Sequence, residues 1–141
     1  MTEKSAQKDI FCREEIIGSS TLAKVGTARI VLSMDAVAKH HMLVMPIRHV
    51  ERIDELTDEE HRDIVKALRS IEEFYKAHNI EGYKLVLLSG PAAGQTVQHA
   101  HWHVIPGNAE FVTDPKRRSV HYSGKELAWE ADVLRRDFRS R

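Results

Sequence analysis

Histidines alternate with apolar residues in the segment 98–106, Gln-His-Ala-His-Trp-His-Val-Ile-Pro, and this pattern predicts a β-strand. Side chains of a strand point alternately to its two faces. We therefore expect His99, His101 and His103 to share one exposed face, while the apolar residues between them pack into a core. Imidazole nitrogens need hydrogen-bonding partners. Three of them in a row indicate a site for a metal ion or for an anionic group such as phosphate.

Apolar residues at spacings of three and four predict a long amphipathic helix that ends near Asn79 or Gly82. The segment 57–60, Thr-Asp-Glu-Glu, is a capping box and marks its start. A second box at 123–126, Ser-Gly-Lys-Glu, predicts a C-terminal helix. The inner side of that helix is expected to carry Leu127, Leu134 and Phe138.

Residues rich in aliphatic and β-branched side chains predict strands at 22–32, 42–45 and 83–88, before the histidine segment. Because strands and helices do not alternate strictly, we expect an α+β fold with a largely antiparallel sheet of about five strands. A long central helix and the C-terminal helix would cover one face, and the histidines would lie on the other. Residues 1–8 are interpreted as a flexible tail and 9–141 as a single domain, with 114–118 as a surface loop.

The composition narrows the setting of this domain. The chain has 141 residues, with 21 basic and 21 acidic side chains, so no net charge favours nucleic acid or an anionic membrane. Its single cysteine, Cys12, excludes an internal disulfide. We find no signal peptide, and no apolar run approaches the ~20 residues of a membrane span. These features predict a cytoplasmic protein, with a nuclear location also open.

The loop that leads into the histidine segment, 89–96, contains two glycines and two hydroxyl groups. Gly94 would let the backbone approach an oxyanion closely, and Gln95 and Thr96 would donate hydrogen bonds to it. Taken alone, such a loop is more often a plain turn. Its direct junction with three histidines favours an anion site.

Residues 94–106, Gly-Gln-Thr-Val-Gln-His-Ala-His-Trp-His-Val-Ile-Pro, resemble the signature of the histidine triad (HIT) family of nucleotide hydrolases and transferases. The segments 10–12 and 41–46, His49 and the helix start at Thr57 also lie where that family has them. The resemblance covers about residues 10 to 106. The C-terminal segment around Trp129 resembles the fragile histidine triad branch, which hydrolyses dinucleoside polyphosphates.

The resemblance implies a mechanism in which His101 attacks the α-phosphorus of a dinucleoside polyphosphate and forms a covalent nucleotidyl-histidine that water then hydrolyses. His103 would assist the leaving group, and His99 together with His41 would orient His101. The resemblance also implies a homodimer in which two sheets join into one. The expected substrate-binding residues are Gly94, Gln95, Thr96, Val97, His41, Asp35 and Ser33.

Three positions depart from the family pattern. Leu88 stands where the family usually has an amide that contacts a phosphate oxygen. Ser33 stands where the family has an acidic or amide residue for the ribose, and we expect Asp35 to take over that role. His40 replaces the glycine that usually precedes His41. These changes put the rate and the substrate in doubt, but they leave the nucleophile in place.

Several other readings stay open. Within the family, the alternative is a nucleoside phosphoramidase. A nucleotide-binding sensor with little turnover is a rival from another class. Metal binding by the three histidines is a third reading, although no carboxylate lies near them in the sequence. Removal of adenylate from DNA ends is a fourth, and the chain is too short for the DNA-binding modules that this activity usually requires.

A structural zinc site is a separate question, because some relatives hold zinc with two cysteines and two histidines. The matching positions here are Asp9, Cys12, His49 and His99. A carboxylate in place of a thiolate weakens a zinc site, and a lone cysteine is usually a small buried apolar residue. The sequence therefore favours the absence of zinc and of any other cofactor.

Overall fold

A computed structural model describes residues 9–140; the expected tail, 1–8, and Arg141 lie outside the described residues. The elements in chain order are α2 (Glu14–Ile17), η1 (Gly18–Ser20), β1 (Thr21–Val25), β2 (Ala28–Leu32), β3 (Asp35–Ala36), β4 (Met42–Pro46), η2 (Ile53–Glu55), α3 (Asp58–Ala77), β5 (Tyr83–Leu87), η3 (Pro91–Ala93), β6 (Trp102–Pro106), η4 (Pro115–Arg117), β7 (Val120–His121) and α4 (Gly124–Arg139). None of these helices is long and apolar enough to cross a bilayer.

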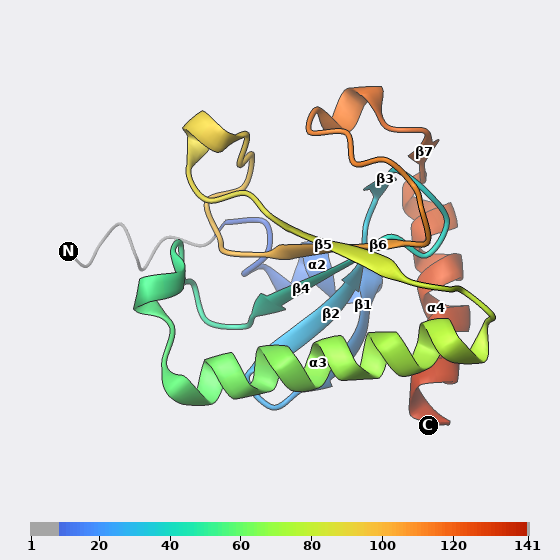
Figure 1. Cartoon of the computed structure of the whole chain (residues 1–141), viewed down its shortest axis with the longest axis horizontal. Coiled ribbons are helices and arrows are strands. Elements are labelled where there is room, and N and C mark those ends of the chain that lie inside the picture. The colour runs from blue at the N-terminus through green and yellow to red at the C-terminus, as the bar shows by residue number, and fades with distance from the viewer. Residues whose placement is uncertain (1–8, 141) are drawn as a thin grey trace.

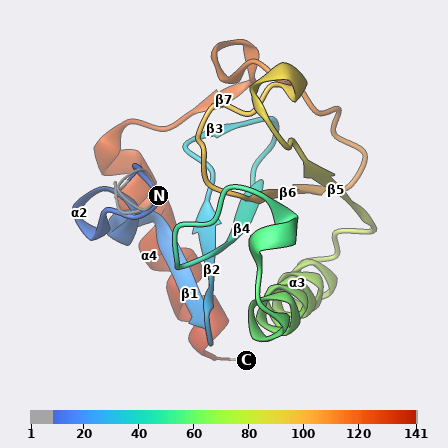
Figure 2. The ribbon, with the colours of Figure 1, turned by 90° about the vertical axis from the view of Figure 1, so that its left-hand side faces the viewer.

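Five strands form one antiparallel sheet in the order β1-β2-β4-β6-β5. A separate two-stranded ribbon pairs β3 with β7. The expected α+β class and antiparallel sheet are confirmed. In Figure 1, α3 runs along one side of the sheet, and the loops that contain η3 and η4 rise on the opposite side. Figure 2 shows the same separation after a quarter turn.

Both long helices begin where the capping boxes predict. Thr57 accepts a hydrogen bond from the Glu60 backbone at the start of α3, and Ser123 does the same with Glu126 in α4. The two helices bury their apolar faces against one face of the sheet. Burial of such faces is the main driving force for the fold. The core residues on this side include Ile30, Leu32, Met42, Val44, Ile71, Phe74, Val104, Leu127 and Leu134.

The opposite face of the sheet carries a second, smaller apolar cluster. Val31 of β2 and Leu43 and Met45 of β4 pack there against Phe11 and Ile17 of the N-terminal segment. His103 of β6 is paired with Leu43 of β4. The prediction that the two faces of the sheet differ is thus confirmed. Helices cover one face, and the opposite face carries His103, the histidine that lies within a strand.

Two details of the histidine prediction are wrong. Strand β6 begins at Trp102, so His99 and His101 precede it and lie in irregular backbone. The three side chains are also buried rather than exposed, since their residues are 0%, 5% and 4% accessible. The N-terminal segment and the loops close over them, and sequence periodicity carries no information about such distant coverage.

Candidate active site

A pocket of about 130 Å³ opens on the face of the sheet opposite α3 and α4. His101 and His103 line it, together with Gly94 and Thr96 of the loop before them. Ser33 and Asp35 contribute from the β2–β3 connection, and the other lining residues are Ile10, Phe11, Met34, Leu43, Leu88, Pro115 and Arg118.

The hydrogen bonds of His101 decide which of its nitrogens is reactive. Its Nδ1 lies 2.7 Å from the carbonyl oxygen of His99. A carbonyl can only accept, so Nδ1 carries the hydrogen and the neutral ring has its lone pair on Nε2. Phe11 packs edge-on against the ring, with centroids 5.0 Å apart, and restricts its orientation. His101 is thus a neutral imidazole with a lone pair on Nε2, the form that a nucleophilic histidine needs.

A chain of three groups sets the tautomer of His103. The backbone N–H of Val37 donates to Nδ1 of His41 at 3.1 Å, so His41 carries its hydrogen on Nε2. That Nε2 lies 3.0 Å from Nδ1 of His103 and donates to it. His103 therefore carries its own hydrogen on Nε2 and can donate it to a bound oxygen. The structure corrects the expectation that His41 orients His101, because its hydrogen-bond partner is His103.

Burial keeps these imidazoles neutral. It lowers the pKa of His101 below its ordinary value, that of His41 to about 3 and that of His103 to about 2. Removing the rings from water disfavours their charged forms, and the positive charge of Arg118 adds to the effect on all three pKa values. At neutral pH the site therefore offers a lone pair on His101 and a neutral donor on His103.

The expected binding residues divide into two groups. Ser33, Asp35, Gly94 and Thr96 line the pocket. The other four expected residues do not line the pocket. Gln95 is buried and its side chain accepts the Gly90 N–H at 2.7 Å, and Val97 packs on the second apolar cluster. The side chain of His41 is hydrogen-bonded to His103, and that of His99 to the Pro46 carbonyl. The Asp35 carboxylate is held 2.8 Å from Nδ1 of His121, while its residue still borders the pocket.

Gly94 is required by its surroundings as well as by its backbone. Its φ is +100°, in the region that favours glycine, and an added Cβ would overlap Cγ2 of Thr113. The structure shows a close approach of this glycine to Thr113, and the predicted approach to an oxyanion stays a prediction. His40 adopts a φ of +72°, which glycine would adopt more easily. Tyr75 donates to the His40 carbonyl at 2.7 Å and helps to hold this turn before His41.

Arg118 is the functional candidate that the sequence did not reveal. It was expected in a surface loop, 114–118, and that expectation is wrong for this residue, which is 8% exposed and lines the pocket. The ribbon of β3 and β7 brings the segment back over the sheet. No periodicity marks such a loop residue, and only the pairing of two distant two-residue strands places it.

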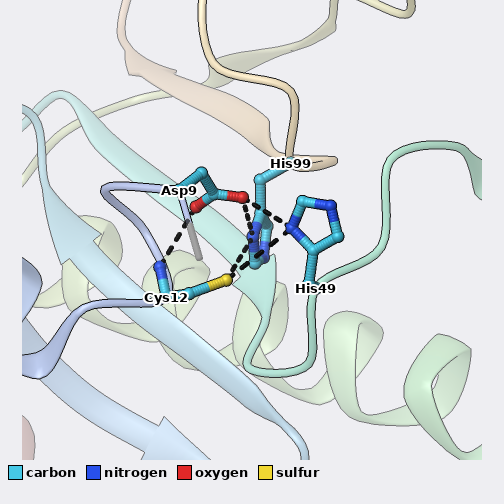
Figure 3. A group of neighbouring side chains, drawn as sticks. All are labelled: Asp9, Cys12, His49 and His99. Carbon is cyan, nitrogen blue, oxygen red and sulfur yellow. Dashed lines mark hydrogen bonds and ion pairs between the residues drawn. The ribbon is translucent and has the colours of Figure 1, made fainter. Parts of the chain in front are cut away.

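A second cluster lies beside the histidines, where Asp9, Cys12, His49 and His99 each direct one ligand atom to a common point (Figure 3). These four atoms all lie within 4.8 Å of one another. One carboxylate oxygen of Asp9 is 2.7 Å from Nδ1 of His49 and 3.1 Å from Nδ1 of His99. Sγ of Cys12 is 3.7 Å and 3.5 Å from the same two nitrogens.

This donor set fits a zinc ion. Nε2 of His99 donates to the Pro46 carbonyl at 2.7 Å, so in the neutral ring the Nδ1 lone pair faces the Asp9 carboxylate. A cation at the centre, or the thiol hydrogen of Cys12 donated to this nitrogen, would satisfy these facing acceptors. Nε2 of His49 lies 3.2 Å from Glu51, the kind of outer carboxylate that supports a ligating histidine. Bound zinc would tie the N-terminal segment to the sheet. The expectation of no metal remains untested, while the geometry weighs against it.

A family model described as HIT domain matches residues 16–110. The chain belongs to the HIT family. Over 113 residues it is 36% identical to a bis(5'-adenosyl)-triphosphatase of Dictyostelium discoideum, covering 74% of this chain and 76% of the relative. Over 99 residues it is 32% identical to an adenosine 5'-monophosphoramidase of Schizosaccharomyces pombe, covering 69% and 72%.

The fold of the HIT chain also matches solved structures. The NitFhit protein of Caenorhabditis elegans aligns with a TM-score of 0.69 and 28% sequence identity. The alignment covers 84% of this chain and 27% of that longer protein, which is named as a fusion of nitrilase and fragile histidine triad parts. The resemblance first recognised in the 94–106 signature therefore extends over the sheet and helices of the HIT fold.

Proposed function

We propose that this HIT protein is a hydrolase that cleaves a dinucleoside polyphosphate at its α-phosphate through a covalent intermediate on His101. The observation that carries the proposal is the 2.7 Å hydrogen bond from Nδ1 of His101 to the His99 carbonyl. It places the lone pair on Nε2 of a buried, neutral ring that lines the pocket. The names of the relatives supply the substrate class.

In the first step, Nε2 of His101 forms a bond to the α-phosphorus while the bond from phosphorus to the leaving nucleotide's oxygen breaks. His103 donates its Nε2 hydrogen to the oxygen on which negative charge develops, which stabilises the transition state. In the second step, the oxygen of a water molecule bonds to the phosphorus and its proton passes to solvent, while the nitrogen–phosphorus bond breaks and His101 regains its lone pair. The products are a nucleoside monophosphate and the remaining nucleotide.

A nucleoside phosphoramidase is the second candidate, favoured by the kinship with the fission yeast monophosphoramidase. The same two histidines suit it, because only the leaving group changes from a phosphate to an amine. The nitrogen bound to phosphorus must take up a proton in order to leave as a neutral amine. The donor on His103 would therefore matter more for this substrate than for the polyphosphate.

We also propose that the protein forms the homodimer implied by the family, through the β5 edge of the sheet. Strand β5 pairs only with β6 among the described strands, and Leu85 on it is 46% exposed. An open edge with an apolar side chain is a ready template for strand pairing. Sedimentation of Leu85→Lys against the unchanged protein tests this, and an equal mass for both would contradict pairing at β5.

The catalytic proposal is tested by incubating the protein with diadenosine triphosphate and, separately, with an adenosine phosphoramidate. Products are followed by chromatography, and the intact mass of the protein is recorded during turnover. We expect cleavage of the triphosphate and a transient mass gain of one adenylate. Neither should occur with His101→Ala, which should still bind AMP.

His61→Ala is a suitable control, because His61 is an exposed histidine on α3, distant from the pocket lining. It should cleave at the rate of the unchanged protein. Preferential cleavage of the phosphoramidate would favour the second candidate. Tight AMP binding without cleavage of either substrate would contradict both enzymes and favour a nucleotide sensor.

A further inference from the structure

Arg118 is buried in the wall of the pocket without a carboxylate partner. Its guanidinium nitrogens donate to three backbone carbonyls, those of Val112, Asp35 and Thr113, at 2.8 to 3.1 Å. Among the described residues, no carboxylate oxygen forms an ion pair with it. Burial lowers the pKa of Arg118, yet guanidinium stays charged at neutral pH. The carbonyls compensate for part of the lost water but leave the charge without a counter-ion.

The two carboxylates that act on the charge of Arg118, those of Asp35 and Asp114, are engaged elsewhere. The Asp35 carboxylate lies 2.8 Å from Nδ1 of His121 and forms a hydrogen bond with it. The Asp114 carboxylate accepts a hydrogen bond from the backbone N–H of Lys116 at 3.0 Å. Both raise the pKa of Arg118 through space, without direct contact. A buried charge without a close partner is costly, and it is normally paired or hydrogen-bonded to an ion or a ligand.

The charge of Arg118 is the main positive charge available to a ligand of this pocket. His101 and His103 are neutral at pH 7, because burial lowers their pKa values. Of the remaining lining residues that the structure describes, only Asp35 is charged, and it is negative. A nucleotide brings at least one phosphate into the pocket. Without Arg118, that phosphate would meet neutral donors alone.

We propose that Arg118 binds a phosphate oxygen of the nucleotide that occupies this pocket. This inference rests on the proposed nucleotide chemistry. Each terminal nitrogen of a guanidinium has two hydrogens, and each uses one on a backbone carbonyl, so two donors remain. Phe111, whose ring centroid lies 5.2 Å from the guanidinium carbon, limits the orientation of the group.

Arg118 lies in the C-terminal part of the chain, outside the segment 16–110 that the HIT family model matches. It reaches the pocket through the β3–β7 ribbon. Leu88, which also lines the pocket, cannot donate a hydrogen bond. Arg118 therefore supplies hydrogen-bond donors to a pocket in which position 88 supplies none.

The test measures the dissociation constant of ADP by calorimetry at low and at high salt. Arg118→Gln should weaken binding about 10- to 100-fold, as expected for the loss of a charge-assisted hydrogen bond, and should make binding less dependent on salt. Arg118→Lys keeps the positive charge, so its dissociation constant for ADP should stay within about fivefold of that of the unchanged protein. Arg117→Gln removes an exposed arginine next to it and should stay within about twofold.

Equal ADP binding by Arg118→Gln and Arg117→Gln would overturn the inference, as would a lack of ADP binding by the unchanged protein. If Arg118 only clamps the loop, Arg118→Lys will bind as weakly as Arg118→Gln, with an unchanged salt dependence; this also overturns it. Should Arg118→Gln fail to fold, the salt dependence of ADP binding by the unchanged protein decides, and binding that does not weaken at high salt overturns the inference. Failure to cleave diadenosine triphosphate would end the catalytic proposal and leave this binding result standing.

Discussion

The backbone carbonyl of His99 accepts the Nδ1 hydrogen of His101, while the side chain of His99 belongs to the cluster with Asp9, Cys12 and His49. One residue thus connects the candidate metal site to the candidate nucleophile. The ring of His99 is also fixed by the Pro46 carbonyl at 2.7 Å. The contacts that fix the ring of His99 therefore also fix its backbone carbonyl, which is the acceptor that determines the tautomer of His101.

Two substitutions of His41 distinguish the effect of its two hydrogen bonds from the effect of its size. In His41→Gln, the amide can accept from Val37 and donate to His103, as the imidazole does. We expect kcat for diadenosine triphosphate to stay within a few-fold. His41→Leu removes both bonds, so His103 loses its fixed tautomer, and kcat should fall about 10- to 100-fold with a smaller change in KM. Equal kcat values for the two variants would exclude the tautomer argument.

The buried imidazoles predict how stability depends on pH. Their pKa values, about 3 for His41 and about 2 for His103, lie below the value of about 6.5 in the unfolded chain. The unfolded state therefore takes up protons that the folded state refuses, and stability falls as the pH drops below about 6.5. Each of these rings lowers the free energy of unfolding by about 1.4 kcal/mol for every pH unit below this value.

Urea unfolding at pH 7.5, 6 and 5 measures this slope, in a range above the ordinary pKa values of carboxyl groups. His41→Gln removes one of these buried imidazoles and should reduce the slope by about one proton. A free energy of unfolding that stays constant between pH 6.5 and 5 would show that these rings are accessible to protons in the folded state.

Gly94 and Thr113 should be energetically coupled. Gly94→Ala combines backbone strain at a positive φ with the overlap on Thr113, whereas Gly82→Ala has a φ of +77° and meets no atom within 4 Å. We expect about 1 kcal/mol of destabilisation for Gly82→Ala and at least about 1 kcal/mol more for Gly94→Ala. Adding Thr113→Ser, which removes Cγ2, should recover part of the excess. Additive free energies in this double-mutant cycle would rule out the contact.

The four-residue cluster predicts the binding of one zinc ion. After dialysis against a chelator, added zinc should bind with a stoichiometry near one and raise the melting temperature, since it binds the folded state only. Cys12→Ala should abolish this effect, and Asp9→Cys should tighten binding because thiolate is the softer ligand. His61→Ala, which changes an exposed histidine outside the cluster, should bind zinc normally. Unchanged binding by Cys12→Ala would place the metal elsewhere.

The main elements of the fold follow from local sequence rules. Thr57 and Ser123 mark the helix starts because a side-chain oxygen can satisfy free backbone N–H groups of the first turn wherever the helix lies. The strands at 22–32, 42–45 and 83–88 are likewise visible as short apolar runs, and the structure places β1, β2, β4 and β5 there. The 94–106 signature identified the family, because its residue types and spacing are specific.

The sequence by itself thus determined the fold class, the family and the identity of the candidate nucleophile. Only the tertiary structure decided that His41 bonds to His103, that the triad is buried, that Asp9 and Cys12 meet His49 and His99, and that Arg118 enters the pocket. Capping, periodicity and motif spacing act over a few residues along the chain. These contacts join residues that lie up to 90 positions apart, and packing, which has no local signature, brings them together.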